Sequence, residues 1–176
     1  IWGAGATTAK RDLGAVEKTQ FSADAWTGLI GGRSIIAASD GTLSEDDFAE
    51  MVAYRDLAVG AWEAAVAATV VHYINAILQD IGTYNTDDYD LNRVAKHWSE
   101  AKGYGLWFQF NPNSPLDDGD FAVLHDVLGT APRLPDAGDE AIDAWTLDLV
   151  DARGLLASAF DFDAVNVGDE QGQYGW

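Results

Sequence analysis

Cysteine is absent from the 176 residues of this chain, which excludes disulfides, thiolate metal sites and a cysteine nucleophile. Basic residues are scarce, because ten Lys and Arg face 29 Asp and Glu, and the formal net charge is −19 at pH 7. A field of this sign repels phosphate, so nucleic acid is excluded as a partner and an anionic membrane surface is disfavoured. Long apolar runs are also missing: residues 64–73, the longest candidate, are interrupted by His72 and fall short of the roughly 20 residues that cross a bilayer. The sequence therefore predicts no transmembrane segment.

The acidic excess has two interpretations. Carboxylates are the oxygen ligands that hard cations prefer, but they also solvate the surface of a protein adapted to salty water. The acidic residues are spread along the whole chain, which favours the second interpretation. The chain opens at Ile1 without a start methionine, which indicates a cut within a larger protein or the removal of a leader.

Apolar periodicity predicts helices and no strands. Residues 22–38, 44–81, 89–110, 118–128 and 139–160 carry apolar side chains three or four positions apart. In the longest segment, Ser44 and Asp47 occupy the positions of a capping box. Residues 1–20 are expected to be an irregular lead-in from a missing N-terminal half, and residues 163–176 an irregular tail. The predicted fold class is all-α, an up-down bundle of four to five helices over residues 21–162.

Glycines and one arginine modify this prediction. Gly31-Gly32 is expected to kink its helix, and Gly103 and Gly105 predict the close approach of another backbone. The segment that holds them, 89–110, is apolar on all sides and is expected to be buried on all sides. Arg55 shares an apolar stripe with Trp62 and is expected to need a buried acidic partner.

His97 and Glu100 are the candidate functional pair. Residues i and i+3 of a helix share a face, so both side chains can converge on one atom. In a structural role the two would only satisfy each other's hydrogen bonds. In a functional role an imidazole and a carboxylate are both ligands for zinc, iron or manganese. Because a closed site needs about four ligands, further ligands would have to come from elsewhere.

Other polar residues fit structural roles. His72 is expected to be a satisfied core histidine, and His125 to be exposed on a short acidic helix. Asp117 or Asp118 is expected to cap that helix, since the complete ligand pattern of a calcium loop is missing. Ser99 stands two positions from His97 and so points to a different face, which excludes it as that histidine's nucleophilic partner.

The run from Ala95 to Pro115 resembles the C-terminal half of an imelysin-like family. This branch is catalogued mainly as a domain of unknown function in envelope proteins of Gram-negative bacteria, and it is related to the imelysin peptidases. Four other stretches agree with the family in order and spacing: Thr8–Gly14, Gly32–Ile36, Ala61–Asn75 and Leu128–Pro132. The resemblance spans about residues 7 to 165.

The resemblance implies a fold of two helical bundles, with this chain supplying most of the second. An N-terminal bundle or a second chain would then be the partner that completes the fold. Relatives are exported, often as lipoproteins, are linked to iron uptake and are classed with metallopeptidases. Of their Gly-x-His-x-x-Glu signature, His97 and Glu100 match, while Ala95 stands at the glycine position.

Three hypotheses follow from the residues and the resemblance. The first is metal acquisition or sensing, in which His97 and Glu100 bind iron, zinc or another divalent metal. The protein would act in the periplasm or at the outer membrane or extracellular surface of a Gram-negative bacterium. The second is a non-catalytic interaction or scaffold subunit of an envelope assembly, in which the pair is structural. The third is a metallopeptidase with Glu100 as its base, for which the chain offers no complete ligand set.

Overall fold

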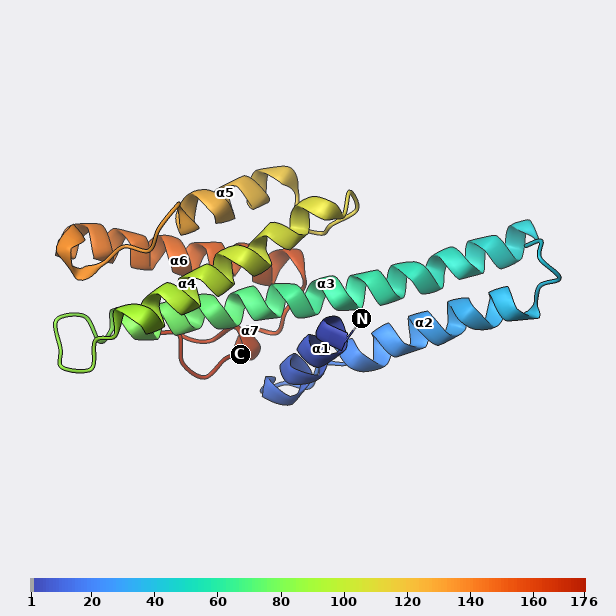
Figure 1. Cartoon of the computed structure of the whole chain (residues 1–176), viewed down its shortest axis with the longest axis horizontal. Helices are drawn as coiled ribbons and strands as arrows, with labels where there is room; N and C mark the ends of the chain where they lie inside the picture. The colour runs from blue at the N-terminus through green and yellow to red at the C-terminus, as the bar shows by residue number, and fades with distance from the viewer. Residues whose placement is uncertain (1) are drawn as a thin grey trace. The chain divides into compact units, whose positions relative to one another are not determined.

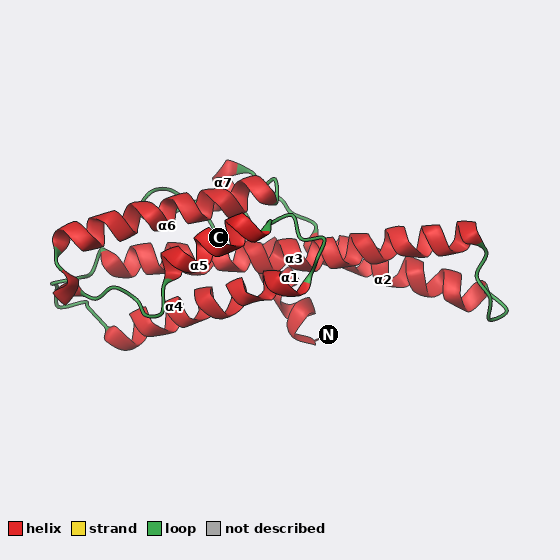
Figure 2. Ribbon diagram, turned by 90° about the horizontal axis from the view of Figure 1, so that it is seen from above, coloured by secondary structure: helices red, strands yellow, loops and turns green. Residues whose placement is uncertain are grey.

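The computed structural model describes the backbone of residues 2–176 and side-chain burial from residue 5 onward. Ile1, at which a cut was expected, lies outside the described residues. Every regular element from residue 2 to residue 176 is helical, which confirms the all-α class (Figure 2). The chain divides into two compact units: a hairpin unit, residues 1–13 and 18–65, and a bundle unit, residues 14–17 and 66–176. The membership of this chain in a larger two-bundle fold stays a prediction.

The hairpin unit contains α1 (Trp2–Gly14), α2 (Phe21–Ala38) and the first part of α3 (Glu45–Ile81). A short loop joins α2 to α3, and the two helices run antiparallel, as Figure 1 shows in blue and cyan. The predicted capping box is present at the start of α3: the Ser44 hydroxyl donates to Asp47 Oδ2 at 2.7 Å, and the Asp47 amide donates to Ser44 Oγ at 3.1 Å. The turn chemistry of residues 39–47 therefore sets where α3 begins.

Glycines let α2 and α3 approach closely. A Cβ atom on Gly28 would lie 2.5 Å from the Tyr54 carbonyl oxygen and 2.7 Å from the Ala58 amide nitrogen. A Cβ atom on Gly31 would collide with the Tyr54 ring. Gly28 thus permits backbone contact with α3, and Gly31 makes room for the Tyr54 ring, while the kink expected at Gly31-Gly32 stays a prediction.

The expectation of an irregular lead-in over residues 1–20 is wrong, because α1 is helical from residue 2 to residue 14. From residue 5 onward, its buried residues are Thr8 and Arg11, which are polar and add nothing to an apolar period. Asp12 then joins α1 to α2, since its carboxylate accepts the amides of Phe21 and Ser22, each at 2.9 Å. Burial raises the pKa of Asp12, but these bonds and one from Thr19 outweigh it and leave the pKa below its usual value.

The bundle unit contains the rest of α3, then α4 (Leu91–Gly105), η1 (Leu106–Phe110), α5 (Asp118–Leu128), η2 (Pro135–Ala137), α6 (Asp139–Ala159) and α7 (Ala164–Val167). α5 packs against both α4 and α6. The largest fully buried apolar side chains of the bundle unit come from α3, α5 and α6: Ile74, Ile77, Leu124, Leu128, Leu149 and Leu156. The predicted segments 118–128 and 139–160 match α5 and α6 to within one residue, as apolar spacing with clear caps allows.

The predicted helix 89–110 changes type at residue 106. α4 ends at Gly105 and is followed by the 3-10 helix η1. Phe108 is 3% exposed, whereas Trp107 is 48% and Phe110 76% exposed, so the expectation of burial on all sides is wrong. A 3-10 turn has three residues instead of 3.6, so one of its aromatic side chains points inward and its neighbours point out.

The tail from residue 163 holds only the four-residue α7 as regular structure, and specific hydrogen bonds fix it. The Asn166 side chain bonds the amide and the carbonyl of Glu17, at 2.8 and 2.9 Å. The Asn75 amide, buried in α3, donates to the carbonyls of Val167 and Trp176, and Arg153 of α6 donates to its oxygen. A buried polar network therefore ties the tail to α3 and α6.

One described helix, α3, meets the length and composition of a membrane-spanning helix. Its most apolar window has a mean hydropathy of 1.4, and 61% of that window is buried inside the protein. The core helices of soluble proteins meet the same criterion, so the absence of a transmembrane segment stays a prediction.

Candidate functional site

His97 pairs with Asp80. Its Nδ1 lies 2.7 Å from Asp80 Oδ2, and the other Asp80 oxygen accepts from Arg93 Nε at 2.6 Å. The Asp80 side chain is 4% exposed, and the Arg93 and His97 side chains are 37% and 21% exposed. Arg93 also donates to the Thr83 hydroxyl and to the Asp88 carbonyl, each at 3.1 Å. A buried carboxylate at the end of α3 thus holds two side chains of α4 in place.

Aromatic rings complete the surroundings of His97. Tyr73 of α3 lies with its ring centroid 6.2 Å from that of His97 and 5.9 Å from that of Tyr104, against which it stacks. A carboxylate that orients an imidazole is one half of a nucleophilic or general-base arrangement. None of the described hydrogen bonds joins His97 to a serine, threonine or cysteine. The geometry therefore supports a structural role for His97, in which it holds α4 against Asp80 of α3.

Glu100 belongs to a different surface. It lines a hollow with Gly103 and Trp107, and His97 is not among the residues that line this hollow. The partner of His97 is Asp80, so the structure gives the two predicted residues separate surroundings although they share a helix. Among residues 2–176, no group of three or more His, Cys, Asp or Glu side chains is placed to hold a metal ion. Metal binding by His97 and Glu100 therefore stays a prediction.

His125 is partly buried, and the expectation that it is exposed is wrong. Both of its ring nitrogens are shielded from solvent, and the backbone of Gly105 lies within hydrogen-bonding reach of the ring. The ring lies 4.3 Å from Phe121, centroid to centroid, and its Cε1 would lie 3.5 Å from a Cβ atom on Gly105. Burial is the largest cause that lowers the pKa of His125; a hydrogen bond with the Gly105 backbone opposes it, and the cation of Lys102 lowers the pKa further. His125 is thus a partly buried packing element beside Gly105, at a distance that would also admit a Cβ atom there.

The remaining sequence-based expectations concern capping and arginine pairing. Asp117 caps α5, because its Oδ1 accepts the Asp120 amide at 2.8 Å, as expected. Arg55 pairs with its neighbour Asp56 at 2.6 Å, and both side chains are more than half exposed. The expectation of a buried partner for Arg55 is therefore wrong.

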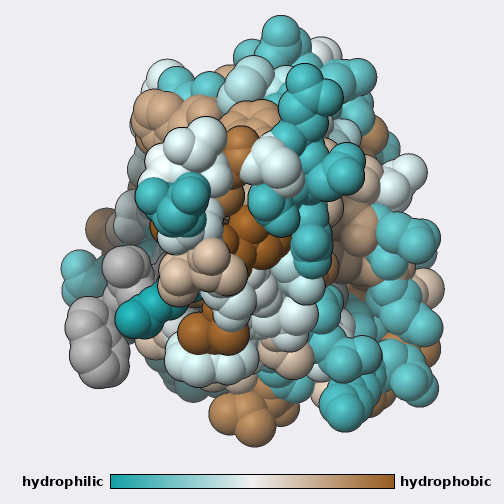
Figure 3. All heavy atoms as spheres, turned by 90° about the vertical axis from the view of Figure 1, so that its right-hand side faces the viewer, coloured by the Kyte–Doolittle hydropathy of each residue, from teal (hydrophilic) through white to brown (hydrophobic). Residues whose placement is uncertain are grey.

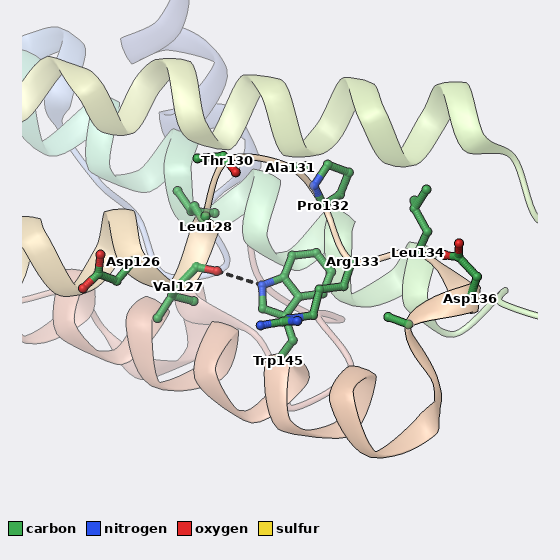
Figure 4. Close-up of a pocket in the computed structure, with 12 residues that line it drawn as sticks. Asp126, Val127, Leu128, Thr130, Ala131, Pro132, Arg133, Leu134, Asp136 and Trp145 are labelled. Carbon is green, nitrogen blue, oxygen red and sulfur yellow. Dashed lines mark hydrogen bonds between the residues drawn. The ribbon is translucent and has the colours of Figure 1, made fainter.

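A second pocket of about 450 Å³ lies under the loop between α5 and α6. Figure 4 shows Trp145 with its indole nitrogen bonded to the Val127 carbonyl, and Asp126 and Asp136 at opposite ends of the pocket. The loop is held by Tyr84, whose hydroxyl donates to the Arg133 carbonyl at 2.7 Å. Burial, aided by Tyr89 and Asp80, raises the pKa of Tyr84 to about 12. The charged residues that line the pocket, Asp126, Arg133 and Asp136, are exposed and of mixed sign, so their charge favours no class of ligand.

The hairpin unit presents an apolar surface that sequence reasoning did not single out. We define the hairpin face as Trp26, Leu29, Arg33 and Ile36 of α2 with Phe48, Val52, Arg55, Val59 and Trp62 of α3. Trp26 is 67%, Ile36 57% and Phe48 55% exposed. Figure 3 shows apolar side chains, in brown, reaching the surface between polar ones. The spacings of three and four were visible in the sequence, but they indicated burial.

The two stripes of the hairpin face lie on the same side of the helix pair. Leu29 directly follows the contact residue Gly28, and Val59 directly follows the contact residue Ala58. One residue is a rotation of about 100°. Because the helices are antiparallel, the same rotation on both turns the two stripes toward one side. An apolar pocket of about 610 Å³, lined among others by Trp26, Leu29 and Trp62, lies where the stripes meet α1.

Comparisons of the chain with family models, with curated proteins and with solved structures find no match.

Proposed function

We propose that this protein is a non-catalytic interaction module of an assembly at the cell envelope, which binds a partner helix through the hairpin face. The observation that carries this proposal is the distribution of burial in the hairpin unit. Its described buried hydrophobic residues are all alanines: Ala25, Ala58, Ala61 and Ala65. Its large apolar side chains are exposed or only partly buried, which is the reverse of the pattern in a self-sufficient helical unit.

The size of the face fits a binding surface. From their exposed fractions, Trp26, Leu29, Ile36, Phe48 and Val59 leave roughly 500 Å² of apolar side chain in water. Patches of this size on a monomer are at the upper end of the ordinary range, of about 300 to 600 Å², and mark interaction sites.

The charges of the face specify the partner. Arg33 and Arg55 stand inside the apolar stripes, on adjacent helices and at neighbouring heights. A second copy of the chain, docked by two-fold symmetry on this face, would bring four guanidinium groups together with only two Asp56 carboxylates. Because Asp56 already pairs with Arg55, burial of the face requires a carboxylate from the partner chiefly for Arg33. The partner is therefore an amphipathic helix of another polypeptide that carries Asp or Glu within its apolar stripe.

Designed peptides test this proposal. The probes are two amphipathic helical peptides of equal length with a leucine stripe, one with two Glu residues in the stripe and one with two Lys residues. Titration calorimetry with the whole chain is expected to show at least tenfold tighter binding of the Glu peptide. The double variant Arg33→Glu, Arg55→Glu reverses the preference, whereas Arg133→Glu, on the bundle unit, leaves it unchanged.

A matched pair of variants locates the surface. Trp26 and Leu147 are both 67% exposed, the first on the hairpin face and the second on α6. Trp26→Ser is expected to abolish binding of the Glu peptide, and Leu147→Ser to leave it intact. Equal effects of the two variants, or a stable dimer of the chain in sedimentation equilibrium, contradict the proposal.

Metal acquisition at the envelope is the alternative proposal. It needs His97 to leave Asp80 or to bind through its other ring nitrogen, with Glu100 and ligands from elsewhere. Metal analysis of the natively purified protein separates the two proposals. Stoichiometric iron or zinc that is lost in a His97→Ala variant supports metal acquisition, and metal-free protein that still binds the Glu peptide supports the interaction module.

A further inference from the structure

A hollow of about 300 Å³ opens on the surface of α4 and η1. Its lining comes from one continuous stretch of chain: Ser99, Glu100, Gly103, Tyr104, Leu106, Trp107 and Phe110. All of these residues belong to the bundle unit.

The hollow exists because Gly103 has no side chain. Gly103 stands three residues after Glu100 and four before Trp107, so a side chain there would fill the gap between them. A Cβ atom on Gly103 would meet no atom within 4 Å. Glycine in a helix costs about 1 kcal/mol relative to alanine, so this residue weakens the helix without easing any packing contact. Gly105 differs, because the ring of His125 occupies the space beside it.

The rim of the hollow combines a carboxylate with aromatic faces. Glu100 lines it together with Trp107 and Phe110, which are 48% and 76% exposed. Tyr104 is fixed by its stacking on Tyr73. Indole is the best of the aromatic partners for a cation, and an adjacent carboxylate supplies a full opposing charge. Exposed indole beside a carboxylate favours an organic cation over an anion or a neutral apolar molecule.

The surrounding charge acts in the same direction. The bundle unit holds 20 acidic and five basic residues. Its negative field raises the local concentration of cations. A bare metal ion fits poorly, since one carboxylate gives at most two of the ligands that such an ion needs.

We propose that this hollow binds a small organic ammonium ion, with the cation between the Glu100 carboxylate and the Trp107 indole. A free quaternary amine and a lysine side chain share this chemistry. The site is independent of the hairpin face, so either proposal can fail without the other.

The test follows backbone and indole resonances of the ¹⁵N-labelled chain during titration. The probes are choline, its uncharged isostere 3,3-dimethylbutanol, and N-acetyl-lysine methylamide as a primary ammonium. Choline or the lysine derivative is expected to shift resonances of residues 99–110 and to bind at least tenfold more tightly than the alcohol. The tighter of the two cations identifies the source. Equal binding of choline and the alcohol, or shifts spread over other segments, overturns the proposal.

Filling the hollow supplies the decisive variant. Gly103→Leu is expected to abolish choline binding and to raise the thermal midpoint, because leucine favours a helix over glycine. Gly154→Leu is the matched control, since a Cβ atom on Gly154 of α6 also meets nothing within 4 Å. It is expected to raise the midpoint and to leave choline binding unchanged. Undiminished choline binding by a folded Gly103→Leu variant overturns the site.

Glu100→Gln separates charge from shape. It is expected to weaken choline binding at least fivefold and to leave the weak binding of 3,3-dimethylbutanol unchanged. If Glu100→Gln binds choline as tightly as the unaltered chain, the carboxylate has no part in recognition and the proposal fails.

Discussion

The hairpin unit and the bundle unit use apolar residues in opposite ways. In the bundle unit, leucine and isoleucine side chains such as Leu149 and Ile77 are fully buried. In the hairpin unit, Ile36 and Trp26 are more than half exposed, and alanine and glycine form the contact between the helices. The charge differs as well: nine acidic residues face five basic ones in the hairpin unit, and 20 face five in the bundle unit.

The helices of the two units are therefore stabilised in different ways. The bundle unit gains stability from apolar area removed from water, at about 25 cal/mol per Å². The hairpin unit gains its order from a capping box, from close backbone contact at Gly28 and from the Asp12 carboxylate at the start of α2. A unit held by caps and backbone contact keeps its large side chains available for a partner.

The largest expected effect compares two isoleucines. Ile77→Ala removes a side chain with no exposed surface and is expected to lower the free energy of unfolding by about 3 to 4 kcal/mol, because it leaves a cavity. Ile36→Ala, at a site 57% exposed, is expected to change it by less than about 0.5 kcal/mol. Urea unfolding followed by circular dichroism measures both values. Similar losses in the two variants mean that the hairpin face is already covered.

The second effect concerns the buried carboxylate of the bundle unit. Asp80→Ala removes the partner of both Arg93 and His97 and is expected to cost roughly 2 to 3 kcal/mol. Asp56→Ala, which removes the exposed partner of Arg55 in the hairpin unit, is expected to cost less than about 0.5 kcal/mol. Thermal unfolding of the two variants at pH 7 gives the comparison. If Asp80→Ala leaves the stability unchanged, the cluster of Asp80, Arg93 and His97 has no structural role.

The third effect tests the helix contact of the hairpin unit. Gly28→Ala is expected to destabilise α2 against α3 by about 1 to 3 kcal/mol, because its Cβ atom would meet the Tyr54 carbonyl and the Ala58 amide. Gly60→Ala, where a Cβ atom meets nothing within 4 Å, is expected to stabilise α3 by up to about 1 kcal/mol. Hydrogen exchange of the α2 amides reads out both changes. Slower exchange in Gly28→Ala contradicts the close contact.

The smallest effect is a pH dependence confined to the bundle unit, which holds all three histidines of the chain. The folded pKa of His125 lies below its ordinary value of 6.5, so the unfolded chain binds the proton first. The contribution of neutral His125 is present above pH 6.5 and is lost as pH falls below it. Between pH 7.5 and 5.5, urea unfolding is expected to show a larger loss for the unaltered chain than for His125→Leu. The Gly105 backbone and Asp126 oppose the shift, and Lys102 supports it. Identical losses in the two proteins contradict a buried neutral imidazole.

The sequence predicted the elements whose signals are local. α3 begins at a capping box and α5 at the Asp117 cap, and both signals are readable within four residues. The sequence analysis did not predict α1, because its buried described positions include Thr8 and Arg11, and apolar periodicity does not count polar residues. The change to a 3-10 helix at Leu106 was also not predicted, since alternative helix types share the same residue preferences.

The surroundings of the predicted pair were not predictable. Asp80 lies 17 residues from His97 on another helix, and only the packing of α3 against α4 brings their side chains together. Glu100 shares its helix with His97, but helical spacing alone does not show which neighbour a side chain contacts. At Gly103 the sequence predicted the close approach of another backbone, and this expectation is wrong, because a Cβ atom there would meet nothing within 4 Å.

The tie between Asn75 and the tail has a consequence for the order of folding. Its hydrogen bonds close loops of 92 and 101 residues, and the bonds between Asn166 and Glu17 close one of 149 residues. Closing long loops is entropically costly and slow, whereas the contacts between α2 and α3 join neighbours in the chain. During synthesis the α2–α3 pair can therefore form early, while the bundle unit waits for residues 166–176 to leave the ribosome. In that interval the hairpin face of the nascent chain is accessible to a partner helix before the bundle unit has folded.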